Sequence, residues 1–403
     1  MLTRKENLTT GISLWMGDGK QSEFSAGQSA KSIRTDIVVV GTGISGALVA
    51  DALLNAGYSV TVVDRRNILS GSTTASTALL QFEIDTPLIK LEKTIGKSNA
   101  ARAWLRSAQA VQALSGRIID LKIRCSYAPR STLYLPGNVL GLKELKREAD
   151  ARQKLGLRST FIDRSELEEL SGFRAAGAIL SRGNAEANPV KLTAGLWRNF
   201  LNKGGRIVGN LDVTDVGQTR SLVKLKAADG RSIVAKHAVF CTGYELMPFA
   251  KPKGYKITST WVLATKPQPK NVWKGQSLIW EAADPYLYMR TTADGRIIAG
   301  GEDEAFSNAE LRDGMIPQKI SAIAKGAKKI WPHANFDAEY AWAGSFGDSP
   351  TGLPAIGPIK KLPRCYAVLG FGGNGITFSM LASQLVSRHI QGIHDPDAEL
   401  FAL

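Results

Sequence analysis

The stretch DIVVVGTGISG, residues 36–46, decides the fold of this chain. An unbroken apolar run such as residues 37–40 is typical of a strand that is buried on both faces of a parallel sheet. A helix of small residues is predicted over residues 44–56, and Gly57 stands where a left-handed helix cap favours glycine. A second apolar strand then ends at Asp64. This order of strand, glycine turn, helix and strand predicts a βαβ unit in an α/β fold.

The glycines of this stretch form a GxGxxG pattern. Gly41, Gly43 and Gly46 permit a tight turn and let backbone N–H groups approach a pyrophosphate at the positive end of a helix. Asp64 follows Gly46 by 18 residues, at a strand end where a carboxylate can accept from a ribose hydroxyl. The same carboxylate would repel a 2′-phosphate, which disfavours NADP. A plain glycine turn would also match the pattern, but its place between a strand and a helix favours a bound dinucleotide.

Length and composition limit the class of protein. A chain of 403 residues has room for two or three domains, and its hydrophobic fraction of 44% is ordinary for a globular protein. No apolar stretch reaches the about 18 residues of a membrane-spanning helix. The first residues are polar where a signal peptide would be apolar. We therefore expect a cytoplasmic protein with no membrane span.

The charges and the potential metal ligands of the chain indicate which binding partners to expect. The net charge of +15 is spread along the chain without a basic-aromatic repeat, so nucleic acid is not the expected partner. Cys125, Cys241 and Cys365 are far apart and form no CxxC pair, which indicates a reducing compartment. The four histidines show no ligand spacing. We expect neither a disulfide nor a metal, and the oligomeric state stays open.

Later segments add further glycine turns. A strand enters Cys241-Thr242-Gly243 far beyond the about 150 residues in which a nicotinamide-binding domain is usually complete. A strand, a glycine turn and a helix follow at 366–391, and between these lie the serine-rich loop GSTTAS, 71–76, and WAGSFGDSPTGLPAIGP, 342–358. In this order the segments resemble the D-amino-acid oxidase (DAO) superfamily of flavoproteins, which includes glycine, sarcosine and γ-glutamylputrescine oxidases.

Two features are most similar to the γ-glutamylputrescine oxidase and glycine oxidase branch. They are DPYLYMRTTADGRIIAGGEDE, residues 284–304, and Trp15 ahead of the nucleotide motif. The polar residues 1–35 are expected to form an arm that lies over the folded body through Leu14 and Trp15.

The resemblance implies a non-covalently bound FAD, because the cysteine or histidine that tethers FAD in some relatives has no match here. A helix starting near Gly375 would direct backbone N–H groups at a flavin carbonyl that becomes negative on reduction. A glycine-rich helix entry that only packs is the alternative. The residues expected to contact FAD are Gly41, Gly43, Ile44, Ser45, Gly46, Asp64, Arg65, Ser72, Thr73, Ser76, Val213, Thr242, Gly243, Gly344, Gly372, Gly373, Asn374, Gly375 and Ile376.

The resemblance also implies the domain organisation. The fold class is α/β, with a discontinuous Rossmann-type FAD-binding domain and an α+β substrate domain built on an antiparallel sheet. The expected bounds are an N-terminal arm at 1–35, an FAD-binding domain at 36–85, 181–250 and 340–403, and a substrate or cap domain at 86–180 and 251–339.

The implied reaction is oxidation of a C–N bond. A small amine or amino acid would give hydride to flavin N5, and water would hydrolyse the imine, as in amine and amino-acid oxidases or dehydrogenases. The candidate catalytic residues are Arg290, Tyr288 and Asn374. Amino-acid-handling relatives place arginines where this chain has Phe346 and Gly373. Strand alternation puts Arg290 on the face of Tyr288, so its guanidinium is a candidate to bind a remote substrate carboxylate.

Several alternatives stay open at this point. Arg290 would instead be structural if it pairs with Glu281 or Glu302. Glu83 and Asp85 either polarise a substrate amine or lie on a solvated strand edge. The basic net charge would suit a flavoenzyme acting on a modified RNA base, and a flavin-binding subunit of a larger dehydrogenase would need a partner to receive its electrons. The amine and the electron acceptor are not specified by the sequence.

Overall fold

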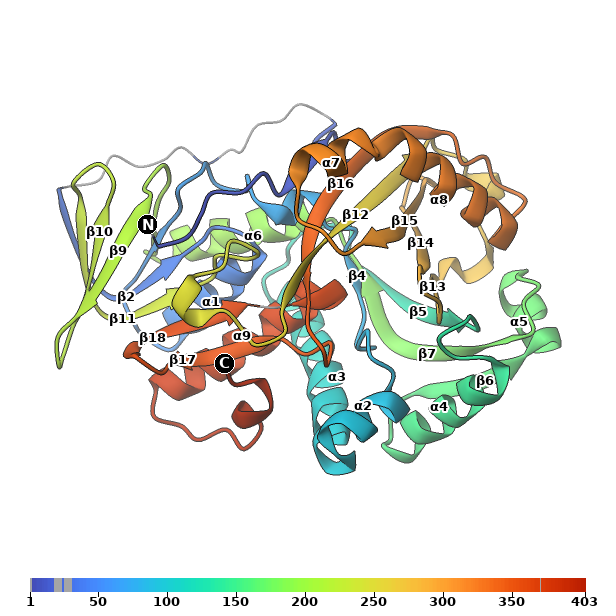
Figure 1. Cartoon of the computed structure of the whole chain (residues 1–403), viewed down its shortest axis with the longest axis horizontal. Helices are drawn as coiled ribbons and strands as arrows, with labels where there is room; N and C mark the ends of the chain where they lie inside the picture. Colours follow the sequence, from blue (N-terminus) through green and yellow to red (C-terminus); the bar gives the residue numbers. More distant parts are fainter. Residues whose placement is uncertain (1, 18–23, 25–30, 370) are drawn as a thin grey trace.

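The chain folds around two sheets that lie side by side (Figure 1). The structure is a computed structural model and describes residues 2–17, 24, 31–369 and 371–403. Within these residues, no helix is long and apolar enough to cross a membrane.

The smaller sheet is the Rossmann-type part of the fold. Five of its strands, in the order β18, β11, β2, β3 and β8, pair in parallel, and β17 and the β9–β10 ribbon add antiparallel pairs. Alternate residues of β2 enter different cores: Ile37 and Val39 pack with the helices, whereas Val38 packs beneath the ribbon. The strands are β17 (Ala355–Ile359), β18 (Leu362–Leu369), β11 (Ser232–Phe240), β2 (Ser32–Val40), β3 (Val60–Val63), β8 (Arg206–Val208), β9 (Val213–Gln218) and β10 (Val223–Ala227).

Small residues and helix caps favour the helices that pack on the smaller sheet. The predicted βαβ unit is present, with α1 (Ile44–Asn55) packed between α9 (Gly375–Ile390) and α6. Helix α6 (Pro189–Asn202) begins with Asn188 as its cap, where the side chain accepts from the N–H of Lys191. Helix α3 (Lys97–Asp120) packs against α9, and α2 (Leu88–Ile95) precedes it.

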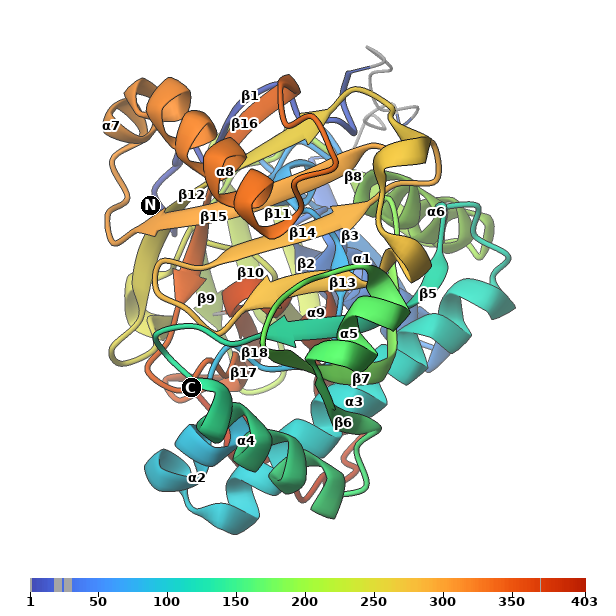
Figure 2. The ribbon, with the colours of Figure 1, turned by 90° about the vertical axis from the view of Figure 1, so that its right-hand side faces the viewer.

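The larger sheet is antiparallel except for one parallel pair, β13 with β5. Helix α8 (Ile316–Ile330) and α5 (Arg164–Ser171) cover its outer face (Figure 2), while α4 (Leu142–Lys154) packs on β6. Alternation in β12 sends Trp261 into the core beneath α8 and Val262 to the opposite, inner face. The strands are β1 (Thr9–Gly11), β16 (Ala338–Asp348), β12 (Lys256–Thr265), β15 (Ile297–Glu304), β14 (Leu287–Thr291), β13 (Leu278–Glu281), β5 (Ala128–Leu135), β7 (Gly177–Glu186), β4 (Leu79–Leu80) and β6 (Ser159–Asp163).

Sheet membership differs from the expected domain bounds. The segment 340–403 was expected in the FAD-binding domain, but β16 pairs along its length with β12 of the larger sheet. Strand β7 likewise pairs with β5 and β6, although its second half was expected in the FAD-binding domain. Conversely, α3 was expected in the cap and packs with the helices of the smaller sheet. The differences arise because hydrogen-bonded pairing across the sheet, not position along the chain, decides where a strand belongs.

Candidate active site

The glycine turn before α1 has room for no side chain at two of its glycines. Gly41 has φ of +118°, and a Cβ there would lie 2.2 Å from the carbonyl oxygen of Cys241. A Cβ at Gly46 would lie 1.9 Å from the carbonyl oxygen of Gly41. Gly43 has no side chain to cap the helix, the N–H of Ile44 donates to Thr73 Oγ1, and the positive end of the helix dipole lies at the cavity. The turn therefore fits an anionic group such as a pyrophosphate.

Asp64 is held beside this turn as a hydrogen-bond acceptor. Its Oδ2 accepts from the backbone N and from Oγ1 of Thr42, both at 2.7 Å, and its Oδ1 accepts from the N–H of Arg66 at 2.9 Å. A carboxylate has about four lone-pair sites, so capacity for a ligand hydroxyl remains. The carboxylate is thus oriented before any ligand binds.

Two hydroxyl groups near the turn lack partners. Ser72 Oγ and Thr242 Oγ1 are buried and make no hydrogen bond with the described residues, and both residues line the cavity described next. A buried hydroxyl without a partner costs free energy. A ligand with several polar atoms fits this arrangement.

One continuous cavity joins the glycine turn to the larger sheet. All residues expected to contact FAD line it except Gly46, whose missing side chain instead allows the close approach to Gly41. The inner face of the larger sheet supplies the opposite wall, which includes Thr260, Val262, Trp280, Tyr288 and Trp342. The cavity is therefore shaped by both sheets.

The turn before α9 lies at this opposite end of the cavity. Gly373 donates its N–H to Asp85 Oδ2 at 2.8 Å. Asn374 is buried, and its side chain donates to the carbonyl oxygen of Glu83 instead of capping α9. Both residues line the cavity. The start of α9 thus directs a helix N-terminus toward the sheet wall.

Comparisons with known proteins agree with this geometry. The family model described as DAO, FAD dependent oxidoreductase, matches residues 36–389. The chain belongs to the DAO family of FAD-dependent oxidoreductases. Its cofactor is therefore FAD, which the glycine turn, the oriented Asp64 and the unpaired hydroxyls fit.

Individual relatives are distant but cover most of the chain. A gamma-glutamylputrescine oxidoreductase of Escherichia coli (strain K12) is 25% identical over 386 residues, covering 92% of this chain and 86% of that protein. A glycine oxidase of Bacillus licheniformis is 23% identical over 371 residues, covering 89% and 94%. The crystal structure of glycine oxidase from Geobacillus kaustophilus superposes with a TM-score of 0.74 at 19% identity, covering 92% of this chain and 98% of that one. The structural likeness supports the shared fold.

Two of the three candidate catalytic residues of this DAO-family chain lie in the cavity. Tyr288 lines it on β14, and burial raises the pKa of its hydroxyl well above the ordinary value. Asn374 lines it at the turn before α9. Their catalytic roles stay predictions.

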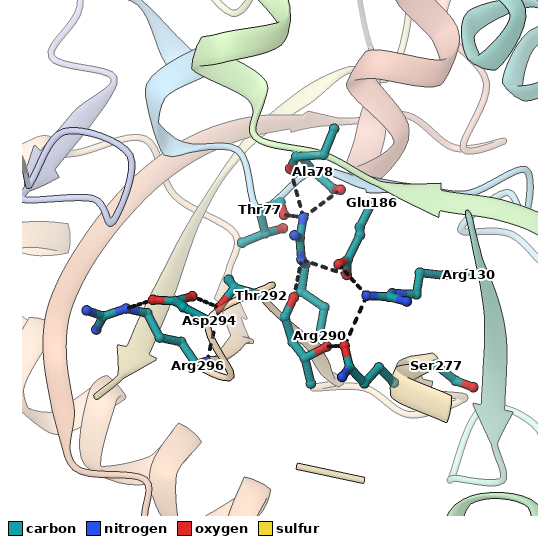
Figure 3. Close-up of polar contacts among 12 residues, drawn as sticks. Thr77, Ala78, Arg130, Glu186, Ser277, Arg290, Thr292, Asp294 and Arg296 are labelled. Carbon is teal, nitrogen blue, oxygen red and sulfur yellow. Dashed lines mark hydrogen bonds and ion pairs between the residues drawn. The ribbon is translucent and has the colours of Figure 1, made fainter. Parts of the chain in front are cut away.

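Arg290 is placed differently from the expectation (Figure 3). It is 2% exposed and is absent from the cavity lining. Its Nη1 donates to the carbonyl oxygens of Thr77 at 2.9 Å, Ala78 at 3.0 Å and Ala187 at 2.9 Å. Its Nε lies 3.5 Å from Glu186 Oε2, so its acidic partner is neither Glu281 nor Glu302.

The substrate-binding role inferred for Arg290 is therefore corrected. The alternation along β14 is as expected, but the cavity ends before this position, where the loop at 77–78 covers the strand. Burial lowers the pKa of Arg290 to about 10, opposed by Glu186, so the guanidinium keeps its charge at neutral pH. It fastens the serine-rich loop to β14 and β7.

Acidic groups gather at the end of the cavity next to the turn before α9. Asp85 opens into the cavity, yet its depth within the protein raises its pKa to about 6, with a further rise from Asp348. Burial raises the pKa of Asp303 to about 7, although hydrogen bonds to Thr260 and Tyr286 oppose this rise. These carboxylates titrate close to neutral pH.

The sequence predicted that the N-terminal segment, residues 2–17, lies over the folded body, but not that it lines the cavity. Leu2, Thr3 and Leu8 line the cavity. The expected contact of the arm through Trp15 is present, because its Nε1 donates to the carbonyl oxygen of Ser76 at 2.7 Å. Strand β1 adds the segment to the larger sheet beside β16. Its polar sequence shows no periodicity that would have indicated this placement.

Proposed function

We propose that this chain uses FAD to oxidise a C–N bond of a small amine or amino acid. The observation that supports this most is the single cavity, which continues from the dinucleotide turn to a wall of the larger sheet. Two of the relatives carry the names gamma-glutamylputrescine oxidoreductase and glycine oxidase, and the compound in each name contains an amine. Bound FAD would supply the hydride acceptor.

The residues of the chain would bind and orient this cofactor. Asp64 would accept from ribose hydroxyls, and the N-terminus of α1 with Ser72 and Thr73 would hold the pyrophosphate. The turn 372–376, with the N-terminus of α9 behind it, would stabilise the negative charge that reduction places on the flavin ring. The wall of the larger sheet would exclude water and position the substrate carbon.

The FAD is proposed to be non-covalent. Cys241 lines the cavity near the glycine turn, but burial raises the pKa of its thiol well above the ordinary value. The thiol therefore stays protonated and is a poor nucleophile.

Anaerobic mixing with a panel of amines and amino acids tests the proposal. We expect at least one member to bleach the flavin absorbance, with release of an amine or ammonia and a carbonyl product. A panel of 2-hydroxy acids and reduced nicotinamides serves as the control. Bleaching by these donors alone would contradict oxidation of a C–N bond.

A further inference from the structure

Three carboxyl groups lie together at the end of the cavity next to the turn before α9. Asp85 lines it, Asp303 lies next to the lining residues Thr260 and Tyr286, and Asp348 lies close enough to raise the pKa of Asp85. Resting on the function proposed above, we infer that the substrate is a cationic amine with no carboxylate on its reacting carbon, and that Asp85 binds its ammonium group.

The position of Asp85 depends on two glycines. A Cβ at Gly372 would lie 2.7 Å from Asp85 Oδ2, and a Cβ at Gly373 would lie 3.0 Å from Oδ1. Gly372 also has φ of +53°, which strains any other residue. The carboxylate therefore sits directly on the turn before α9, anchored through Oδ2 to the N–H of Gly373. Oδ1 accepts no hydrogen bond from the part of the chain that the structure describes, and it is available to a ligand.

The cationic side chains near the cavity pair with acidic side chains of the protein. Among the described residues that line it, the cationic side chains are Arg65 and Arg66. Arg65 pairs with Asp212 at 3.2 Å, and Arg66 donates to Glu245 at 3.0 Å, both at the dinucleotide end. Behind the sheet wall, Lys319 pairs with Glu304 at 2.8 Å. A carboxylate on the reacting carbon would thus face Asp85 without a cationic partner among these residues.

The rest of this wall is aromatic. The rings of Tyr286 and Tyr288 lie 6.0 Å apart at 33°, and Trp280 is stacked on Tyr134 at 3.8 Å. Tyr286, Tyr288, Trp280 and Trp342 line the cavity. Aromatic faces attract cations and pack against alkyl chains. Together with Asp85, this wall suits an alkylammonium ion.

The test uses the FAD-loaded enzyme and one matched substrate pair. Butylamine and norvaline differ only by the carboxylate on the reacting carbon. We expect wild-type kcat/KM for butylamine to exceed that for norvaline at least tenfold. The opposite order would overturn the inference while supporting C–N oxidation, so the two proposals fail separately. If neither compound is oxidised, the binding measurements described next test the inference.

Binding is measured with ions that cannot react as amines. Butyltrimethylammonium and butyrate are titrated against the flavin spectrum of wild type, Asp85→Asn and Asp150→Asn; Asp150 is exposed on α4 and controls for net charge. We expect the cation to bind wild type and Asp150→Asn alike and Asp85→Asn at least tenfold more weakly. Equal affinity in all three would overturn the role of Asp85. Should Asp85→Asn lose FAD, tighter binding of butyrate than of the cation by wild type would do the same.

Discussion

Replacing Asp64 tests the dinucleotide end of the site most directly. Asp64→Ala removes a carboxylate that accepts three hydrogen bonds from the chain and that we expect to accept another from a ribose hydroxyl. A hydrogen bond to a charged group contributes about 1.5–3 kcal/mol, so the Kd for FAD should rise about 10- to 150-fold. Apo-protein is titrated with FAD, and quenching of the flavin fluorescence gives the Kd.

The control separates ligand binding from distortion of the turn. Thr42→Val removes one hydrogen bond to Asp64 Oδ2 and leaves the carboxylate in place. We expect this variant to bind FAD within about threefold of wild type, a difference of less than 1 kcal/mol. Unchanged FAD affinity in Asp64→Ala, or an equal loss in Thr42→Val, would refute a direct contact between Asp64 and the ribose.

The remaining predictions concern other parts of the site. Acid precipitation should release all the FAD, because the buried thiol of Cys241 stays protonated; flavin left on the pellet would contradict this. The folded-state pKa of Asp85 is raised to about 6, so its charge is lost as the pH falls through that value, and binding of butyltrimethylammonium should weaken in parallel in wild type but not in Asp85→Asn. Deleting residues 2–11 should speed FAD dissociation about tenfold, equivalent to about 1.4 kcal/mol, as measured by the rise in flavin fluorescence after dilution; an unchanged rate would show that the segment does not retain FAD. Arg290→Met should destabilise the fold by about 3–5 kcal/mol in urea unfolding, since the buried carbonyl oxygens of Thr77, Ala78 and Ala187 lose their donor while Glu186 keeps Arg130, and Arg290→Lys should recover part of the loss.

Local sequence signals predicted the Rossmann-type part well. The apolar run 37–40 is buried on both faces, as its unbroken pattern indicated. The bounds of helix α6 follow from local signals, because Asn188 caps it, Pro189 suits its first turn and Lys203 precedes two glycines. Each of these signals acts within one turn of the chain, which is why sequence alone could show them.

Features set by distant partners were not predictable in this way. Strand β16 is apolar enough for either sheet, and only its pairing with β12 assigns it to the larger one. The alternation of β14 correctly gave the face of Arg290, but the position at which the cavity ends depends on the loop at 77–78. For Asp85 the sequence left two roles open, polarising a substrate amine or lying on a solvated strand edge. The position of its carboxylate depends on Gly372 and Gly373, which are far away in the sequence.

A single segment, residues 71–85, contacts the elements at both ends of the cavity. Near its start, Thr73 Oγ1 accepts from the N–H of Ile44 in the first turn of α1 at 3.0 Å. In its middle, backbone carbonyls accept from Arg290 of the larger sheet. Near its end, Asp85 accepts from Gly373 at the start of α9. Because one short stretch touches the glycine turn before α1, the larger sheet and the turn before α9, a displacement at either end would shift Asp85 within the cavity. The buried bonds of Arg290 to this segment thus serve the geometry of the active site without touching a ligand.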